Sequence, residues 1–362
     1  MSKNLLFLST RKGLIIYKKS ATTWTYQSTH FLGIPVTLTY VDEQTKTWWA
    51  CLDHGHWGIK LHKSIDQGSN WEEVNAPKYP EGLEIKPGVP ATNKYIWAFT
   101  NGGKNQKEKL ILGTIPGGLF TSLDNGQSFQ LNKSLWNHPS RVEHWFGGGF
   151  DHPGIHSIVI DPQDSNHYYI GISCAGVFET TDDGKNWIVR NQGLRADYLP
   201  DPYTEVGHDP HLLIACPARP NVLWQQNHCG IFRSTDGAKH WKEVTQKDGP
   251  ANFGFTIAVH EQDPDQAWVI PGISDVTRTP IDQSLVVCHT LNGGQDWIEQ
   301  RNGLPQGTSF DIVYRHGLDI TGDTLAFGTT TGNVFLSENL GKNWDCLNHF
   351  LPMVHAVHFA NH

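Results

Sequence analysis

Short apolar runs alternate with polar, glycine-containing turns along the whole chain. Apolar runs this short, bounded by turn residues, predict β-strands rather than helices. Two stretches show the order clearly, with four runs each: 155–161, 168–172, 176–180 and 187–190, then 212–216, 222–226, 230–233 and 241–244. Each set of four predicts one antiparallel sheet, so the pattern indicates an all-β chain.

The two ends of the chain complement each other. The runs at 5–8, 14–18 and 24–27 supply three strands but lack an innermost one, whereas the run at 353–359 has no strand to follow it. We therefore expect the C-terminal strand to complete the first sheet. Such a closure would leave no free sheet edge.

Six eight-residue boxes of the general form Ser/Thr-x-Asp/Asn-x-Gly-x-x-Trp/Phe recur between the runs, at 64–71, 122–129, 180–187, 234–241, 290–297 and 337–344. Their aromatic ends lie 58, 58, 54, 56 and 47 residues apart, and Trp24, 47 residues before Trp71, ends a degenerate first unit. Each box predicts a tight turn in which the carboxylate or amide accepts backbone N–H groups and glycine takes a positive φ. Seven such units predict a seven-bladed β-propeller of four-stranded antiparallel blades, in a single domain over 1–362.

With these boxes the chain resembles the Asp-box (BNR) repeat families, which include sialidases, related glycoside hydrolases, sortilin-type receptors and photosystem II assembly factors. It is similar in particular to bacterial Asp-box propellers labelled sialidase-like proteins or glycosyl hydrolases. The phrases that carry this resemblance are 137–141, 147–149, 195–203 and 225–230. The resemblance implies the propeller fold. The label "glycosyl hydrolase" also implies hydrolase activity, but a label that follows from the fold does not establish a reaction.

Charge and composition narrow the range of partners. The net charge is −8 with scattered Lys and Arg, so the sequence predicts no nucleic-acid partner. The absence of any run near the roughly 18 apolar residues of a membrane span predicts no membrane partner. The first ten residues resemble a strand rather than a signal peptide, and the six cysteines form no CxxC pair. We therefore expect a cytoplasmic protein with reduced thiols.

Histidine is the unusual residue, with 20 copies. When the units are aligned on their turns, His156 and His211 fall at the entry of an innermost strand, so both are expected near the propeller axis. His54, His56 and His228, in turns at the same end, compete for a third place beside them. Three imidazoles predict a site for one divalent transition metal, Zn, Mn, Fe or Cu. The alternative is a solvated axial channel without a cofactor, in which these histidines bind carbonyls and water.

The long insertions between blades collect other candidate residues at the same end as these histidines, where irregular loops on a rigid scaffold build sites. Arg141 and Arg195 are candidates to anchor an anionic or carbonyl group, with Asn227 as a further polar contact. Trp57 and Trp145 offer stacking surfaces for a sugar-like ligand, although each could equally pack between blades.

Proton transfer is assigned to Glu205, with Asp201 and Tyr203 beside it. Resemblance to sialidases would imply an arginine cluster and a Tyr–Glu nucleophile. The Arg-Ile-Pro element of sialidases is missing, however, because Arg11 is followed by Lys12 and Gly13.

These observations together predict an enzyme, a hydrolase or lyase acting on a small polar or carbohydrate-like ligand in a His-rich axial pocket. Two alternatives stay open. One is a metal-free glycoside hydrolase that uses carboxylates. The other is a non-catalytic propeller that binds a ligand or serves as an assembly factor. The sequence leaves the oligomeric state open.

Overall fold

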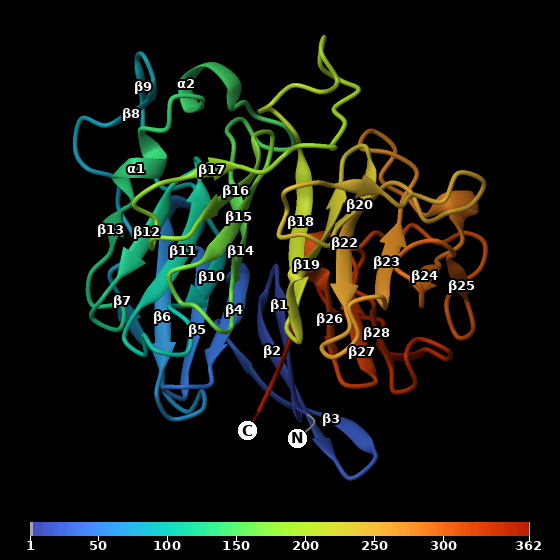
Figure 1. The fold of residues 1–362 in the computed structure, drawn as a ribbon. Coiled ribbons are helices and arrows are strands. Elements are labelled where there is room, and N and C mark those ends of the chain that lie inside the picture. Colours follow the sequence, from blue (N-terminus) through green and yellow to red (C-terminus); the bar gives the residue numbers. More distant parts are fainter. Residues whose placement is uncertain (1–2, 362) are drawn as a thin grey trace. The chain divides into compact units, whose positions relative to one another are not determined.

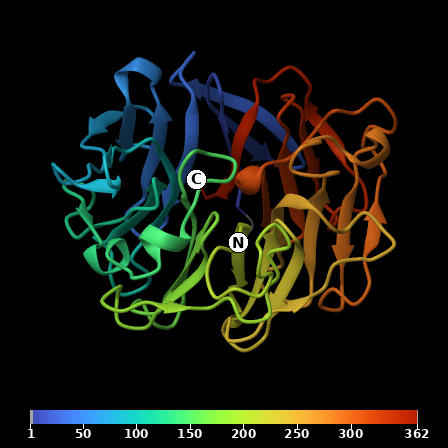
Figure 2. The same cartoon turned by 90° about the horizontal axis from the view of Figure 1, so that it is seen from above.

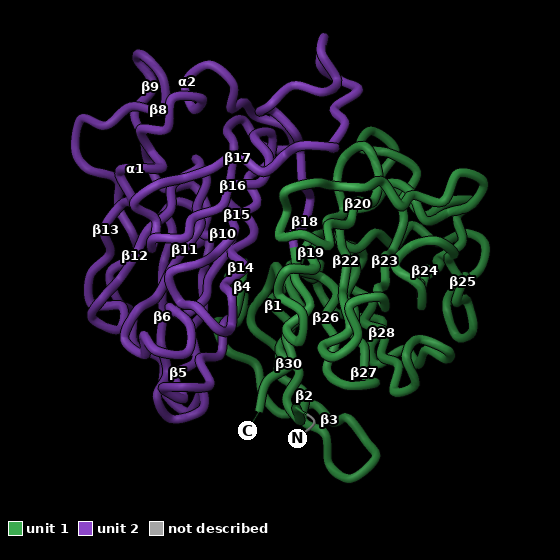
Figure 3. The backbone as a smooth tube through the Cα atoms, in the orientation of Figure 1, with its two compact units in different colours: residues 1–39, 214–362 green, residues 40–213 purple. Residues whose placement is uncertain are grey.

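The computed structural model describes residues 3–361, and the described chain contains seven four-stranded antiparallel sheets (Figure 1). This is the strand topology of a seven-bladed β-propeller, which confirms the predicted fold class. The chain divides into two compact units, residues 1–39 with 214–362 (unit 1) and residues 40–213 (unit 2), which are described separately (Figure 3). The single domain over 1–362 stays a prediction.

Unit 1 contains three complete sheets, whose strands can be followed by colour in Figure 2. In hydrogen-bonding order the first is β3 (Thr23–His30), β2 (Gly13–Ser20), β1 (Leu5–Thr10) and β30 (Val354–Ala360). The second is β22 (Gly254–Val259), β23 (Ala267–Pro271), β24 (Val287–Thr290) and β25 (Ile298–Gln300). The third is β26 (Leu318–Thr321), β27 (Thr324–Gly328), β28 (Val334–Ser337) and β29 (Asp345–Asn348).

The first of these sheets joins the two ends of the chain. β1 pairs antiparallel with β2 on one side and with β30 on the other, with Leu5 opposite Ala360 and Leu8 opposite Val357. The C-terminal strand therefore completes the N-terminal sheet, as the unmatched apolar run at 353–359 predicts.

Unit 2 contains two complete sheets and a two-stranded ribbon. The sheets are β10 (Tyr95–Asn101), β11 (Leu110–Ile115), β12 (Leu119–Ser122) and β13 (Gln130–Leu131), then β14 (Ile155–Ile160), β15 (Tyr168–Ile172), β16 (Gly176–Thr180) and β17 (Ile188–Val189). The ribbon is β8 (Glu84–Lys86) with β9 (Val89–Pro90). The runs predicted at 168–172 and 176–180 match β15 and β16 residue for residue.

The division between the units passes through the first strand of each remaining sheet. These sheets are β4 (Val36–Asp42), β5 (Thr47–Asp53), β6 (Ile59–Ser64) and β7 (Glu72–Val74), and β18 (Pro210–Cys216), β19 (Arg219–Asn227), β20 (Gly230–Ser234) and β21 (Lys242–Glu243). Helical segments are short: α1 (Lys133–Trp136), α2 (Arg141–His144), η1 (Gly55–Trp57), η2 (Ile281–Gln283) and η3 (Arg315–Gly317). Within residues 3–361, no helix has the length and apolar character needed to cross a membrane.

The Asp boxes form the tight turns that the sequence predicts. In the box that follows β16, Thr180 Oγ1 accepts the Gly184 N–H at 2.8 Å, and Asp182 Oδ1 accepts the Asn186 N–H at 2.9 Å. The other five boxes repeat both bonds, at 64–71, 122–129, 234–241, 290–297 and 337–344. These bonds satisfy backbone donors that the turn would otherwise leave unpaired.

One box departs from the expected glycine. Ala238 stands where the other five boxes have glycine, and it takes the left-handed conformation with φ 59°. The preceding residue of every box also has a positive φ, for example Asp183 at 62° and Leu340 at 60°. The turn thus imposes two successive left-handed residues, and its side-chain hydrogen bonds hold even an alanine there.

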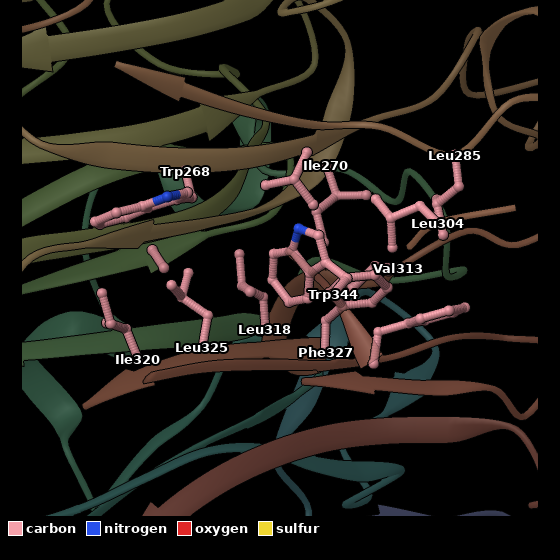
Figure 4. Packing of buried hydrophobic residues seen from close by; sticks show 13 residues of the cluster. Trp268, Ile270, Leu285, Leu304, Val313, Leu318, Ile320, Leu325, Phe327 and Trp344 are labelled. Atoms are coloured by element: carbon pink, nitrogen blue, oxygen red, sulfur yellow. The ribbon is translucent and has the colours of Figure 1, made fainter. Parts of the chain in front are cut away.

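Apolar side chains form the cores of both units. In unit 2, Ile111, Tyr168, Ile170 and Phe178 belong to one buried cluster. In unit 1, the indoles of Trp268 and Trp344 lie among aliphatic side chains of β22 to β28 (Figure 4). Trp344, the aromatic end of the last box, is therefore a packing residue as well as a turn marker.

A half-buried ion network in unit 2 is expected to make the stability of the protein depend on pH. His167 Nε2 lies 2.8 Å from Glu179 Oε1, and His167 Nδ1 lies 3.1 Å from Asp161 Oδ2. Arg190 Nη2 lies 2.6 Å from the other oxygen of Glu179. The hydrogen bond to Glu179 raises the pKa of His167 above its ordinary value of 6.5, although burial acts in the opposite sense.

We expect His167→Gln to lower the free energy of unfolding by about 1–2 kcal/mol at pH near 5.5, and by less at pH near 8.5. A histidine whose pKa is raised by folding stabilises the protein fully below its unfolded pKa, and that contribution is lost as pH rises through the folded pKa. Urea unfolding at both pH values measures the difference. The exposed His56→Gln is the control, and an equal cost of His167→Gln at both pH values would contradict the argument.

Candidate functional site

A buried acid–imidazole pair lies at the start of β18. Asp209 directly precedes the strand and His211 is its second residue, so the two side chains leave the extended backbone on the same side. Asp209 Oδ1 accepts hydrogen bonds from Ser173 Oγ at 2.9 Å and from the Cys174 N–H at 3.1 Å. Asp209 Oδ2 lies 3.5 Å from His211 Nε2. One carboxylate oxygen is thus fixed by the protein, while the other faces the imidazole.

A second imidazole joins this pair within the same sheet. His228 directly follows β19, the strand hydrogen-bonded to β18. One ligand atom from each of Asp209, His211 and His228 can be chosen so that all three lie within 4.8 Å of one another. Asp209 and His211 are buried and His228 is half-buried. Two imidazoles and a carboxylate form a donor set for Zn, Mn or Fe, so this cluster can hold a metal ion.

The other predicted metal ligands lie outside this cluster. His156 is buried on β14, where its Nδ1 lies 2.8 Å from Ser157 Oγ and its ring packs edge-on against Trp97 at 5.5 Å. His54 and His56 belong to the turn around η1, and the ring of His56 lies against Trp57. The grouping therefore takes His211 and His228 from the predicted set and adds Asp209.

Arg141 and Trp145 line a cavity of about 240 Å³ in unit 2, together with Lys86, Asp151 and His152. The guanidinium of Arg141 stacks over Trp136 at 4.1 Å and donates to the Ile85 carbonyl at 2.8 Å. Burial lowers the pKa of Arg141 from its ordinary value. Arg141 thus links β8 to α1 through these side-chain contacts. Binding of substrate would be a second role for this residue.

The remaining candidates for substrate binding are spread over the molecule. Arg195 Nε donates to Asp197 Oδ2 at 2.9 Å. Asn227 is fully buried and accepts the Cys229 N–H at 3.0 Å, which closes the turn after β19. Trp57 is 71 % exposed at η1.

The predicted proton-transfer residues lie on the exposed loop before β18. Asp201 Oδ1 accepts the Tyr203 N–H at 3.0 Å, and Tyr203 is 73 % exposed. Glu205 lines a second cavity in unit 2, of about 540 Å³, together with His138, Ser140, Glu143 and His144. Of the three, Glu205 is the one that the structure places in a cavity with other polar groups.

The sequence alone did not identify Asp209 as a ligand, nor the contact between Ser140 and His138. Asp209 carries a usable signal, because the phrase His208-Asp209-Pro210-His211 sets an acid two residues before an expected ligand at the start of a strand. Ser140 and His138 were noted only as part of a family phrase. Their geometry depends on a turn that no spacing rule predicts.

Comparisons with known proteins support the propeller fold but identify no reaction or substrate. No family model matches the chain, and no curated protein is similar to it in sequence. Among solved structures, an ancestral GH74 enzyme shares 17 % identity over 86 % of this chain with a TM-score of 0.56, and this chain covers only 37 % of that one. YCF48 bound to D1 peptide shares 13 % identity with a TM-score of 0.55, over 92 % of this chain and 93 % of that one. A "putative 6-phosphogluconolactonase" from Bacteroides uniformis ATCC 8492 shares 12 % identity with a TM-score of 0.60, over 99 % of this chain and all of that one. The chain is therefore a propeller similar to those of GH74, YCF48 and lactonase-like proteins, and identities this low show the fold alone.

Proposed function

We propose that this protein is a metal-dependent hydrolase or lyase for a small polar substrate, with the metal held by Asp209, His211 and His228. The observation that carries the proposal is the convergence of one carboxylate and two imidazoles within 4.8 Å in a largely buried part of one sheet. A buried carboxylate beside two imidazoles supplies the oxygen and nitrogen ligands that divalent transition metals prefer.

The donor set supports a catalytic rather than a closed structural site. Three protein ligands leave at least one position of a tetrahedral metal open, whereas structural zinc sites use four. When bound, a divalent metal supplies an acidified water or polarises a carbonyl oxygen. Among the protein groups, Ser173 Oγ and the Cys174 N–H hold Asp209 by one oxygen, which leaves its other oxygen directed at His211. Such outer partners fix ligand orientation.

The proposed reaction class is inferred from the metal-ligand cluster. The proposed substrate class is inferred from the names of structurally similar proteins and from the side chains of the inter-blade loops. The structurally similar proteins carry names that refer to a glycoside hydrolase family, a lactonase and an assembly factor bound to a peptide. The first two names agree with hydrolysis of a sugar-like or lactone-like substrate. A small polar substrate also agrees with the histidine, arginine and tryptophan side chains of the inter-blade loops.

Elemental analysis of the purified, tag-free protein tests the proposal. We expect about one equivalent of Zn, Mn, Fe or Cu per chain after reconstitution and desalting. His211→Ala and His228→Ala should each lose it, because two remaining protein ligands bind a divalent ion weakly. His62→Ala, on β6, is the matched control and should keep it.

His156→Ala separates this cluster from a site at the innermost strand entries. Retention of metal in His156→Ala, with loss in His211→Ala, assigns the ion to the Asp209 cluster. No stoichiometric metal with any of the four ions, or full retention in both His211→Ala and His228→Ala, would overturn the proposal. Carboxylate-based glycoside hydrolysis and pure ligand binding would then be the surviving functions.

A further inference from the structure

A serine and a histidine meet at the start of α2, in the loop between β13 and β14. His138 Nδ1 lies 2.8 Å from Ser140 Oγ. The two residues are separated only by Pro139, and both line the cavity of about 540 Å³ in unit 2. α2 is labelled at the top of Figure 1. A serine hydroxyl within hydrogen-bond reach of an imidazole and open to a cavity is the minimal arrangement of an activated nucleophile.

A backbone N–H shows which group donates in the hydrogen bond between Ser140 Oγ and His138 Nδ1. His138 Nδ1 also lies 3.3 Å from the Ser140 backbone nitrogen, whose N–H can only donate. Nδ1 must therefore be the unprotonated nitrogen of a neutral imidazole, with the proton on Nε2. It follows that the Ser140 hydroxyl donates its proton toward Nδ1. This is the direction that general-base activation requires.

A second donor acts on the serine oxygen. Trp145 Nε1 donates to Ser140 Oγ at 3.1 Å. The indole is buried and lies against Phe178, with ring centroids 5.3 Å apart. Phe178 also packs at right angles to the His138 ring, at 5.2 Å. Ser140 thus accepts from a fixed N–H while donating to a fixed imidazole. An N–H aimed at this oxygen stabilises the negative charge that develops when the proton leaves.

A carboxylate completes the electrostatic setting. Burial lowers the pKa of His138 below its ordinary value of 6.5, whereas the charge of Glu205 acts in the opposite sense. His138 is therefore neutral and able to accept a proton near pH 7, and Glu205 favours the imidazolium that forms when it does. Glu205 lines the same cavity as the serine and the histidine. Glu205 thus has the electrostatic part of the role that the acid plays in serine hydrolases, which is to stabilise the imidazolium.

We propose that Ser140, His138 and Glu205 form a second active site, separate from the metal cluster, that hydrolyses small uncharged carboxylic esters. The cavity is large enough for a short acyl group and a modest alcohol. Trp187, Val189 and Val206 give it an apolar side. The carboxylates of Glu143 and Glu205 give it a negative side that disfavours anionic substrates.

The reaction balances with water as the co-reactant. Ser140 Oγ forms a bond to the ester carbonyl carbon while its proton passes to His138 Nδ1. The bond from that carbon to the alcohol oxygen then breaks, and the alcohol leaves with the proton from Nδ1. Water next gives a proton to Nδ1 and forms a bond to the acyl carbon. The bond between that carbon and Ser140 Oγ breaks, the proton returns to Oγ, and a carboxylic acid is released.

Labelling of the native full chain tests the nucleophile without relying on any variant. A fluorophosphonate probe should form a bond from phosphorus to Ser140 Oγ with loss of fluoride, and peptide mapping should place the adduct on Ser140. Ser157 is an internal comparison, because its Oγ lies at the same 2.8 Å from the Nδ1 of His156 but is buried. An adduct on a different residue, or no adduct, would overturn the proposal.

Hydrolysis of p-nitrophenyl acetate in the presence of a chelator measures the activity. We expect Ser140→Ala to abolish both hydrolysis and labelling. His138→Asn should reduce kcat roughly 10²- to 10⁴-fold, because an amide oxygen can accept the Ser140 N–H in this turn but cannot take up the proton. Ser28→Ala is the matched control and should change neither readout, since Ser28 Oγ also contacts a histidine, at 2.9 Å from His30 Nε2, but lies on β3.

The chelator separates this activity from that of the proposed metal site. Ester hydrolysis that survives the chelator and disappears in Ser140→Ala supports the serine site whatever the metal content. Hydrolysis that the chelator removes and Ser140→Ala leaves unchanged belongs to the metal cluster and would refute the serine proposal. Thermal unfolding of each variant shows whether it is folded, and the labelling of the native chain decides if one is not.

Discussion

Replacing Trp268 by alanine is expected to lower the free energy of unfolding by about 3–5 kcal/mol. Trp268 on β23 is fully buried, and in Figure 4 it lies on the same side of the cluster as Ile320 and Leu325. The indole stacks on His289 with ring centroids 4.3 Å apart, and its Nε1 donates to the Leu340 carbonyl at 3.2 Å. Alanine would lose this packing, leave a cavity and remove one of the two side-chain donors to the Leu340 carbonyl, the other being the Gln300 amide.

Chemical denaturation followed by circular dichroism measures this cost. Trp268→Phe keeps an aromatic ring over His289 but no N–H, so we expect a smaller loss of about 1–2 kcal/mol. Trp57→Ala removes the same side chain from an exposed turn and should change stability by less than about 0.5 kcal/mol. Comparable costs at Trp57 and Trp268 would contradict the packing argument.

Asp209→Ala is expected to have the next largest effect on stability, about 2–4 kcal/mol, and to remove metal binding. The substitution leaves the Ser173 hydroxyl and the Cys174 N–H buried without their acceptor, and each such group costs about 1–3 kcal/mol. It also removes the one anionic ligand of the proposed metal. We expect the metal affinity to fall by at least roughly a hundredfold. Denaturation without metal and titration with Zn measure the two effects separately.

Asp209→Asn distinguishes the structural role from the ligand role. An amide keeps one oxygen for Ser173 and Cys174, so most of the stability should return. The amide carries no charge, so metal affinity should stay low. Asp201→Ala on the exposed loop is the control for both measurements. Full metal binding by Asp209→Asn would show that the carboxylate is not a ligand.

Much of the fold follows from the sequence because its determinants are local. A box is specified within eight residues, and the bond from Gly184 N to Thr180 Oγ1 closes within that span. Strand limits within the sheets follow from short apolar runs bounded by turns, which is why β15 and β16 match the predicted ranges. The outer strands were overestimated. β17 and β21 retain two residues each, although the next N–H groups, of Arg190 and Val244, still donate to carbonyls of the neighbouring strands.

The candidate metal site is harder to predict from the sequence, because its residues come together only when the chain folds. His211 and His228 stand out because histidine is unusually frequent and both lie where the loops meet the strands, whereas Asp209 is one of 36 acidic residues and is marked only by its place two residues before His211. His138 and Ser140 are separated by one residue in the sequence, yet their chemistry depends on the tautomer of His138 that the Ser140 N–H imposes. Residue types alone do not carry that information.

The pairing of β1 with β30 also bears on how the protein is made. The six residues of β1 can pair with β30 only after the more than 300 residues between the two strands have been synthesised. Until then the apolar strand Leu5–Thr10 has one unpaired edge, a template for pairing with other nascent chains. The first sheet is therefore completed only after all the other sheets have been synthesised. A chain interrupted before residue 354 lacks β30 and keeps this edge of β1 unpaired, which exposes it to pairing with other chains.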